Sequence, residues 1–418
     1  MTWIFNSELF NKSSAIDHVN NLSFNRGAST EGELKVLNYI KRELKKEDVE
    51  YKIQPFEWTK TLVFFMKLIF SLIIIYVLIC DVILFFPDIV WIILPLDILL
   101  IITFIMTIKR LMNMERNIYI GKRRESNNII TTVQAKDLYR KRPVIIFSAH
   151  HDSKSTRYSV PLIEILYISV LLLLLIYFTL TTILALWSLI SIWNFFIINN
   201  IFLMIRNIII MISVPIFILV VIVLLNKNTN ESIGSIDNAS GVAVLIELAK
   251  LIRKNPLERI DVIILWCGAE EWGLWGSKQY CIRHFEELDY DYDLNKSYNI
   301  NIDMVGSYLG LVNKKGLFKK KELNQNLNPI IYATAKKMNI NIKPVMNSFG
   351  GGSDYMTFQS FAEKYKKNGF QIGFFNSKED EIYIHSENDT SERCSAKTLN
   401  DCIKLCYDTI RSIDLRVE

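Results

Sequence analysis

Several patterns that mark common classes of protein are missing from this sequence. None of its six cysteines has the paired spacing of a zinc finger, and the first residues lack the basic and apolar regions of a cleaved signal peptide, so we expect none. No basic tract is interleaved with aromatic residues, and the net charge is only +5, so we expect no nucleic-acid partner. Unpaired thiols fit a reducing compartment.

Charged residues are scarce in two long stretches of the chain. Residues 158–226 contain only two, Glu164 and Arg206, and residues 61–108 are also mostly apolar. A membrane-spanning helix needs about 20 mostly apolar residues, so each stretch is long enough for a helical hairpin. We therefore predict four spanning helices, at roughly 61–80, 89–108, 161–186 and 204–226.

The positions of lysine and arginine around these helices predict how they are oriented. The segments between paired helices, 81–88 and 187–203, contain neither residue, whereas the opposite helix ends are flanked by residues such as Lys109, Arg110 and Lys227. Because basic flanks tend to remain in the cytoplasm, we expect an integral membrane protein whose soluble part faces the cytoplasm.

One acidic residue, Asp97, lies inside a predicted spanning helix. An intramembrane carboxylate is a candidate for a functional role such as transport. A contact between helices or a protonated acid is the simpler interpretation, because the sequence pattern shows no partner for it.

Strand-like and helix-like segments alternate in the rest of the chain. Residues 143–149 and 260–268 are continuous apolar runs, typical of strands buried on both faces, and residues 239–255 have the spacing of an amphipathic helix. This alternation predicts an α/β fold with a mainly parallel mixed sheet flanked by helices. The predicted domain is discontinuous, with segments 1–60, 109–157 and 227–418 separated by the membrane hairpins 61–108 and 158–226.

Acidic and imidazole side chains follow the predicted strands of this domain. Ligands bind beyond the carboxyl ends of the strands in such sheets, and five separate segments bring polar groups to that rim: His150 and Asp152, Asp237, Glu270 and Glu271, Asp303, and His385. Carboxylate and imidazole ligands without thiolate suit a catalytic zinc or a similar divalent ion. Of two adjacent acids, one can bind metal while the other takes a proton from water.

Five short motifs resemble the pattern of a known family. They are, in order, HHD (150–152), DNASG (237–241), EEWGLWGS (270–277), DMVG (303–306) and HSENDT (385–390). The chain resembles the dizinc aminopeptidases, which include bacterial leucyl aminopeptidases, aminopeptidase Y, glutamate carboxypeptidase and the glutaminyl cyclases. The resemblance covers about 10–60, 110–157 and 227–415, and it implies a zinc exopeptidase fold.

The resemblance also implies a set of metal ligands for two divalent ions, with zinc the expected metal. His150 and Asp303 would bind one ion, Glu271 and His385 would bind the other, and Asp237 would bridge them. The chain between His150 and Asp237 must then return to the same side of the bilayer. An even number of crossings follows, which is why two helices and not three are predicted there.

The implied activity is hydrolysis of N-terminal residues from peptides by a membrane-anchored aminopeptidase. Glu270 would be the general base, and Asp152 would orient the imidazole of His150. The expected partners are a peptide substrate and the lipid bilayer, and the sequence predicts neither the substrate side chain nor the oligomeric state. His151, His18 and His284 are expected to be structural.

Three alternatives stay open at this point. A glutaminyl-cyclase-like acyltransferase would use the same fold with one zinc ion. A membrane scaffold with a non-catalytic peptidase fold is a second alternative, although such relatives usually lose ligands. The third is a transporter that depends on Asp97. Ser353 and Asp354, in a glycine-rich loop, are assigned no role.

Overall fold

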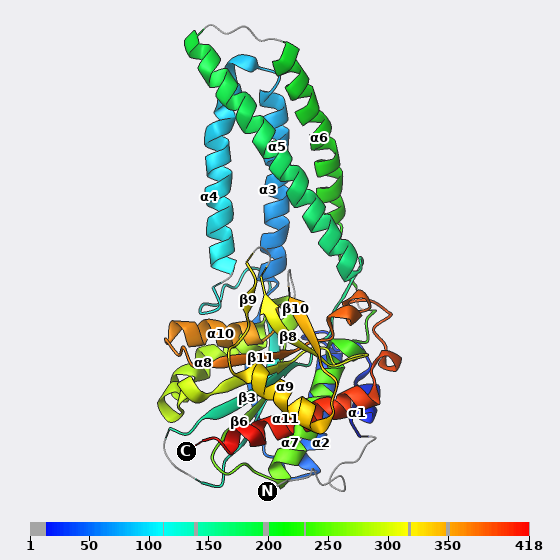
Figure 1. Ribbon diagram of the computed structural model, residues 1–418. Coiled ribbons are helices and arrows are strands. Elements are labelled where there is room, and N and C mark those ends of the chain that lie inside the picture. Colours follow the sequence, from blue (N-terminus) through cyan, green and yellow to red (C-terminus); the bar gives the residue numbers. More distant parts are fainter. Residues whose placement is uncertain are drawn as a thin grey trace. The chain divides into compact units, whose positions relative to one another are not determined.

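A computed structural model describes residues 14–111, 113–137, 141–194, 200–229, 231–316, 319–347 and 352–417 (Figure 1). The chain forms two compact units, each built from segments that are separate in the sequence. The sheet unit comprises Met1–Thr59, Met114–Ser159 and Asn228–Glu418, and the helical unit comprises Lys60–Asn113 and Val160–Lys227.

The sheet unit contains a mixed sheet that has nine strands within the described residues. Their order is β1-β2-β6-β3-β7-β11-β8-β10, with β9 paired to β8. The strands are β1 (Lys52–Trp58), β2 (Arg124–Val133), β3 (Val144–His150), β6 (Asp261–Cys267), β7 (Tyr298–Ile302), β8 (Gly310–Lys315), β9 (Lys321–Glu322), β10 (Lys343–Asn347) and β11 (Gln371–Phe375).

The four central strands, β6, β3, β7 and β11, run parallel to one another. Every residue of β3 and β6 is buried, as expected for the two continuous apolar runs in the sequence. Antiparallel pairs lie outside this centre, where β2 joins β6 and β8 joins β11. The predicted α/β class with a mixed sheet is confirmed. The sequence did not predict β8 and β10, whose exposed ends carry lysine and asparagine.

Helices cover both faces of the sheet (Figure 1). On one face, α8 (Trp275–Asp291) and α10 (Tyr355–Lys364) form a hydrophobic core with β3 and β6. On the other, α7 (Ser240–Lys254) packs on β3 and contacts three further helices. These are α1 (Ser14–Leu22), α2 (Glu31–Lys45) and α11 (Ala396–Asp414), and α11 also contacts α9 (Leu327–Met338).

The helical unit consists of four long apolar helices in the part of the chain that is described. They are α3 (Thr61–Ile83), α4 (Ile93–Leu111) with the preceding 3-10 turn η2 (Pro87–Ile92), α5 (Val160–Asn194) and α6 (Asn200–Leu224). Each is long and apolar enough to cross a membrane. The prediction of a turn over 187–203 was wrong in extent: α5 continues to Asn194 and α6 begins at Asn200. No proline or glycine between 187 and 194 would end the helix.

The surface of the helical unit is strongly apolar. Met211, Met106 and Leu175 have exposed fractions of 73%, 67% and 62%. An apolar surface of this kind is expected where side chains contact lipid. Asp97, in contrast, is buried: Tyr76 Oη donates to its Oδ1 at 2.5 Å, and Thr182 Oγ1 donates to its Oδ2 at 3.0 Å. Both carboxylate oxygens therefore have partners on neighbouring helices, which favours the interpretation of Asp97 as a contact between helices.

Candidate active site

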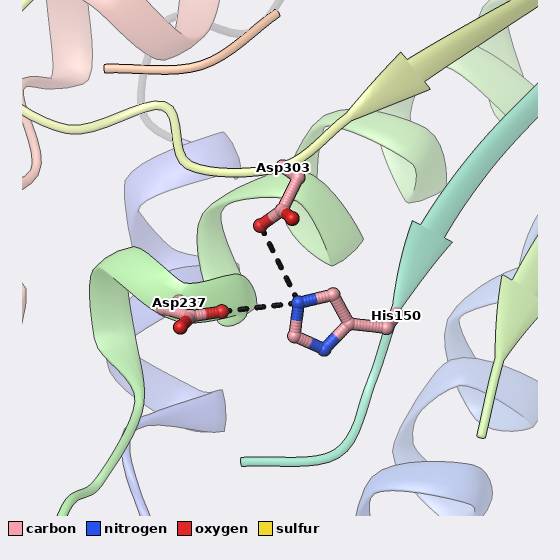
Figure 2. Close-up of side chains that lie close together, drawn as sticks. All are labelled: His150, Asp237 and Asp303. Carbon is pink, nitrogen blue, oxygen red and sulfur yellow. Dashed lines mark hydrogen bonds and ion pairs between the residues drawn. The ribbon is translucent and has the colours of Figure 1, made fainter. Parts of the chain in front are cut away.

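The carboxyl ends of β3 and β7 bring one imidazole and one carboxylate together at the rim of the sheet. His150 ends β3, and Asp303 directly follows β7. Figure 2 shows the carboxylates of Asp303 and of Asp237, which precedes α7, both directed at one ring nitrogen of His150. His150 Nε2 lies 3.0 Å from Asp237 Oδ1 and 3.4 Å from Asp303 Oδ1. All three residues are buried, so these polar atoms contact one another inside the protein and not water.

A second cluster shares Asp237 with the first. His385 Nε2 lies 2.8 Å from Glu271 Oε1 and 3.2 Å from Asp237 Oδ2. Asp237 thus directs one carboxylate oxygen to His150 and the other to His385. In each cluster the three candidate ligand atoms lie within 4.8 Å of one another. A carboxylate shared in this way has the arrangement of a bridging metal ligand.

The protonation of the two clusters shows how strongly their members interact. Burial alone would raise the pKa of Asp237, but hydrogen bonds with His150 and His385 hold it well below its usual range. Burial would lower the pKa of His385, yet the carboxylates of Glu271 and Asp237 raise it to about 10. For His150, the charges of Glu270 and Asp303 likewise outweigh burial and raise the pKa. Nitrogen and oxygen donors therefore face one another where a divalent ion would bind, and the donor set fits such an ion.

Glu270 and Glu271 begin a short turn that Asp152 holds in place. The backbone N–H groups of Glu270 and Glu271 donate to the two carboxylate oxygens of Asp152, at 3.0 and 3.3 Å. The sequence assigned the Asp152 carboxylate to the His150 imidazole, but its Oδ1 lies 3.7 Å from His150 Nδ1, and the Asp152 backbone oxygen is nearer at 3.1 Å. Asp152 therefore positions the acidic pair as well as the imidazole.

Glu270 is buried beside the two clusters. Burial raises its pKa well above the ordinary value, and the charges of Glu271 and Asp354 act in the same direction, although His150 opposes them. A carboxyl group in this environment is suited to accept and return a proton. The preceding Ala269 has a left-handed φ of 51°, as do Leu274 at 58° and His385 at 57°. Such backbone strain is frequent at functional sites.

Comparison with known proteins finds a family that part of this chain resembles. Residues 220–410 match the model of Peptidase family M28. Aminopeptidase YwaD of Bacillus subtilis (strain 168) is 37% identical over 75 residues, which are 18% of this chain and 15% of that relative. The match thus spans less than a sixth of the length of that curated relative.

Solved structures of aminopeptidases and glutaminyl cyclases have a similar architecture. An aminopeptidase from Aneurinibacillus sp. strain AM-1 aligns with a TM-score of 0.54 at 15% identity, covering 97% of this chain and 94% of that one. A glutaminyl cyclase from an Acidobacteriales bacterium aligns with a TM-score of 0.53 at 14% identity, covering 98% and 96%. At these identities the likeness establishes the zinc exopeptidase fold.

Arg26 supports this candidate site and was not predicted from the sequence. Its fully buried guanidinium donates to the backbone oxygens of His151 at 3.0 Å, Ile233 at 2.8 Å and Gly234 at 2.7 Å. The backbone N–H of Arg26 donates to Ser153 Oγ at 2.9 Å. A Cβ on Gly234, where φ is +60°, would lie 2.9 Å from the guanidinium. Arg26 therefore clamps the loop after His150 to the loop before Asp237.

A small ribbon connects the site with the ends of the helical hairpin α5–α6. Strands β4 (Ser155–Thr156) and β5 (Asn228–Thr229) pair where the chain leaves and re-enters the sheet unit. The Thr156 N–H also donates to the backbone oxygen of His385 at 3.0 Å. The two ends of the insertion thus meet beside the site.

Two further carboxylates line the site. Asp389 accepts the N–H groups of Ile236 at 2.5 Å and Asp237 at 3.3 Å, and burial raises its pKa to about 7. Asp354, which was assigned no role, is fully buried, and burial raises its pKa to about 6. Asp389 lies in the predicted HSENDT motif. For Asp354, the glycine-rich loop before it fits a helix cap as well as a place in the site, so the sequence did not identify this residue.

The other histidines lie outside the two clusters. His151 Nε2 is 2.9 Å from the backbone oxygen of Asn127, and His18 lies between Tyr39 and Glu247. His284 Nε2 is 3.1 Å from Gln54 Nε2. These contacts are structural in character.

Proposed function

We propose that this chain is a membrane-anchored, metal-dependent aminopeptidase that removes N-terminal residues from peptides. The observation that carries the proposal is the division of the Asp237 carboxylate between His150 and His385. Together with Asp303 and Glu271, these residues would hold two divalent ions, with zinc the expected metal. When bound, such ions polarise a scissile carbonyl and lower the pKa of water.

The protein itself contributes proton transfer and positioning. Glu270 would take the proton from the attacking water on its carboxylate and return it to the departing amine. Asp152, through the N–H groups of Glu270 and Glu271, keeps the base and the neighbouring ligand at fixed positions. The buried surroundings strengthen each of these electrostatic interactions.

Membrane anchoring forms a separate part of the proposal. It is supported by four helices of sufficient length and hydropathy and by the exposed apolar side chains of the helical unit. The segments between paired helices, 81–88 and 187–203, contain no lysine or arginine, which supports a cytoplasmic location for the sheet unit.

The test combines metal analysis with peptide assays on the purified full-length protein. We expect bound zinc, cleavage of aminoacyl anilides, and loss of cleavage on chelation. Glu270→Gln should lower kcat at least about 100-fold, because the amide cannot accept the proton, and should retain zinc. The surface variant Glu258→Gln, whose partner is Lys136, serves as a control with unchanged activity.

Peptides that begin with glutamine distinguish the cyclase alternative. Release of free glutamine supports the aminopeptidase, whereas formation of pyroglutamate would replace it with an acyltransferase. A protein that binds no zinc and cleaves no peptide would favour the scaffold alternative. Full activity in Glu270→Gln would contradict the assignment of the base.

A further inference from the structure

A lysine lies directly beside one of the two ligand clusters. Lys154 Nζ is 3.6 Å from Glu271 Oε2 and donates to the backbone oxygen of Glu271 at 3.1 Å. It also lies 5.8 Å from the centre of the Trp272 ring. The Lys154 side chain is only 20% exposed. Three contacts with consecutive residues thus keep its ammonium group next to a candidate metal ligand.

The other cluster has different surroundings. In the described part of the chain, the ion pairs of Asp303 and Asp237 are with histidines. The carboxylates of Glu270 and Asp354 act electrostatically on His150. Further carboxyl groups therefore adjoin the cluster of His150 and Asp303, whereas a lysine ammonium adjoins the cluster of Glu271 and His385.

We propose that Lys154 makes the two metal sites unequal, weakening the site of Glu271 and His385 relative to the site of His150 and Asp303. The inference rests on the proposed metal-dependent function and concerns how many ions the protein holds. A divalent ion bound to Glu271 would lie within a few ångströms of the ammonium, at a distance where like charges repel strongly in a partly buried setting. The first ion then binds beside His150, and Lys154 sets the zinc concentration at which the second ion binds.

The test measures zinc occupancy and does not depend on activity. Full-length protein in detergent is stripped with chelator and equilibrated in zinc buffers, and bound zinc is counted by elemental mass spectrometry. We expect two separate binding steps. In Lys154→Gln, the zinc dissociation constant of the weaker step should fall at least about tenfold, while that of the tighter step changes little. Only one of the two sites adjoins the ammonium. Lys154→Met is a second neutral variant, in case one of them folds poorly.

Three further variants complete the design. Lys154→Arg keeps the charge and should keep the two steps apart. Lys367→Gln is the matched control: its side chain is 21% exposed and pairs with Asp289 away from the site, so zinc binding should not change. His385→Ala should remove the weaker zinc-binding step. In the double variant with Lys154→Gln, the zinc affinity of the remaining step should then be unaltered.

Each outcome separates this inference from the proposed function. Equal affinities in the unsubstituted protein, or tightening of both steps together in Lys154→Gln, would overturn the inference even if peptides are cleaved. The expected Lys154 effect without any peptide cleavage would preserve the inference and remove the aminopeptidase assignment. A protein that binds no zinc would contradict both.

Discussion

Arg26 shows how a single residue outside the motifs can determine the geometry of the site. Lysine at this position would keep the positive charge but could not reach the backbone oxygens of His151, Ile233 and Gly234 at once. In Arg26→Lys we expect zinc affinity to fall about 10–100-fold, the range typical of residues that position ligands. The absorption spectrum of the cobalt-substituted protein should also change, because the ligand geometry is altered.

Arg142 provides the matched control for this substitution. It is also largely buried, and its guanidinium binds Asp261 through two nitrogens, at 2.6 and 2.8 Å, away from the site. Arg142→Lys should lower the melting temperature but leave the cobalt spectrum and zinc affinity unchanged. Wild-type zinc affinity in Arg26→Lys would show that the clamp does not position the ligands.

Helix α7 carries a partly buried acid that joins it to α1. Glu247 Oε2 accepts from Ser14 Oγ at 2.8 Å, and its Oε1 lies 2.8 Å from His18 Nε2 and 2.9 Å from Lys250 Nζ. Burial would raise its pKa, but these hydrogen bonds and the Lys250 charge lower it to about 2. Because this is below the value of about 4.3 for an unfolded chain, the acid stabilises the fold above that pH. The contribution disappears as the pH falls toward 2.

Glu247→Gln tests this contact between helices. We expect the free energy of unfolding to fall by about 1–3 kcal/mol at pH 7, and the difference from the unsubstituted protein to narrow between about pH 5 and pH 2. Thermal unfolding followed by tryptophan fluorescence over this range measures it. Glu57→Gln, in an exposed pair with Arg123, should change stability by less than about 1 kcal/mol. A difference that does not vary with pH would contradict the role of the Glu247 carboxylate.

For the whole molecule, the arrangement of the two hairpins predicts which positions can be labelled from outside the cell. All six cysteines are buried, so introduced cysteines can be labelled selectively with a membrane-impermeant maleimide. Asp88 lies in the turn between α3 and α4, and Lys227 follows α6; both are exposed. We expect Asp88→Cys to react in intact cells and Lys227→Cys only after permeabilisation. The reverse pattern would invert the orientation, and labelling from one side alone would contradict the spanning hairpins.

The sequence alone determined those features whose cause is local. Hydrophobic runs specify β3, β6 and the apolar helices, because strands buried on two faces and helices in lipid both need continuous apolar residues. The order of the motifs also indicated which side chains belong to one site. Strands β8 and β10, at one end of the sheet, escaped prediction, since their few buried residues give no clear period.

Only the tertiary structure decided the contacts between residues far apart in the chain. Arg26 meets Gly234, Lys154 meets Glu271, and Asp97 meets Tyr76 and Thr182 because folding brings separate elements together. No periodicity or spacing encodes such pairs. The sequence specified which groups could bind metal. The packing of loops decided that Asp237 is shared by His150 and His385 and that Lys154 lies beside Glu271. The reason is that distances between charges are set only in the folded chain.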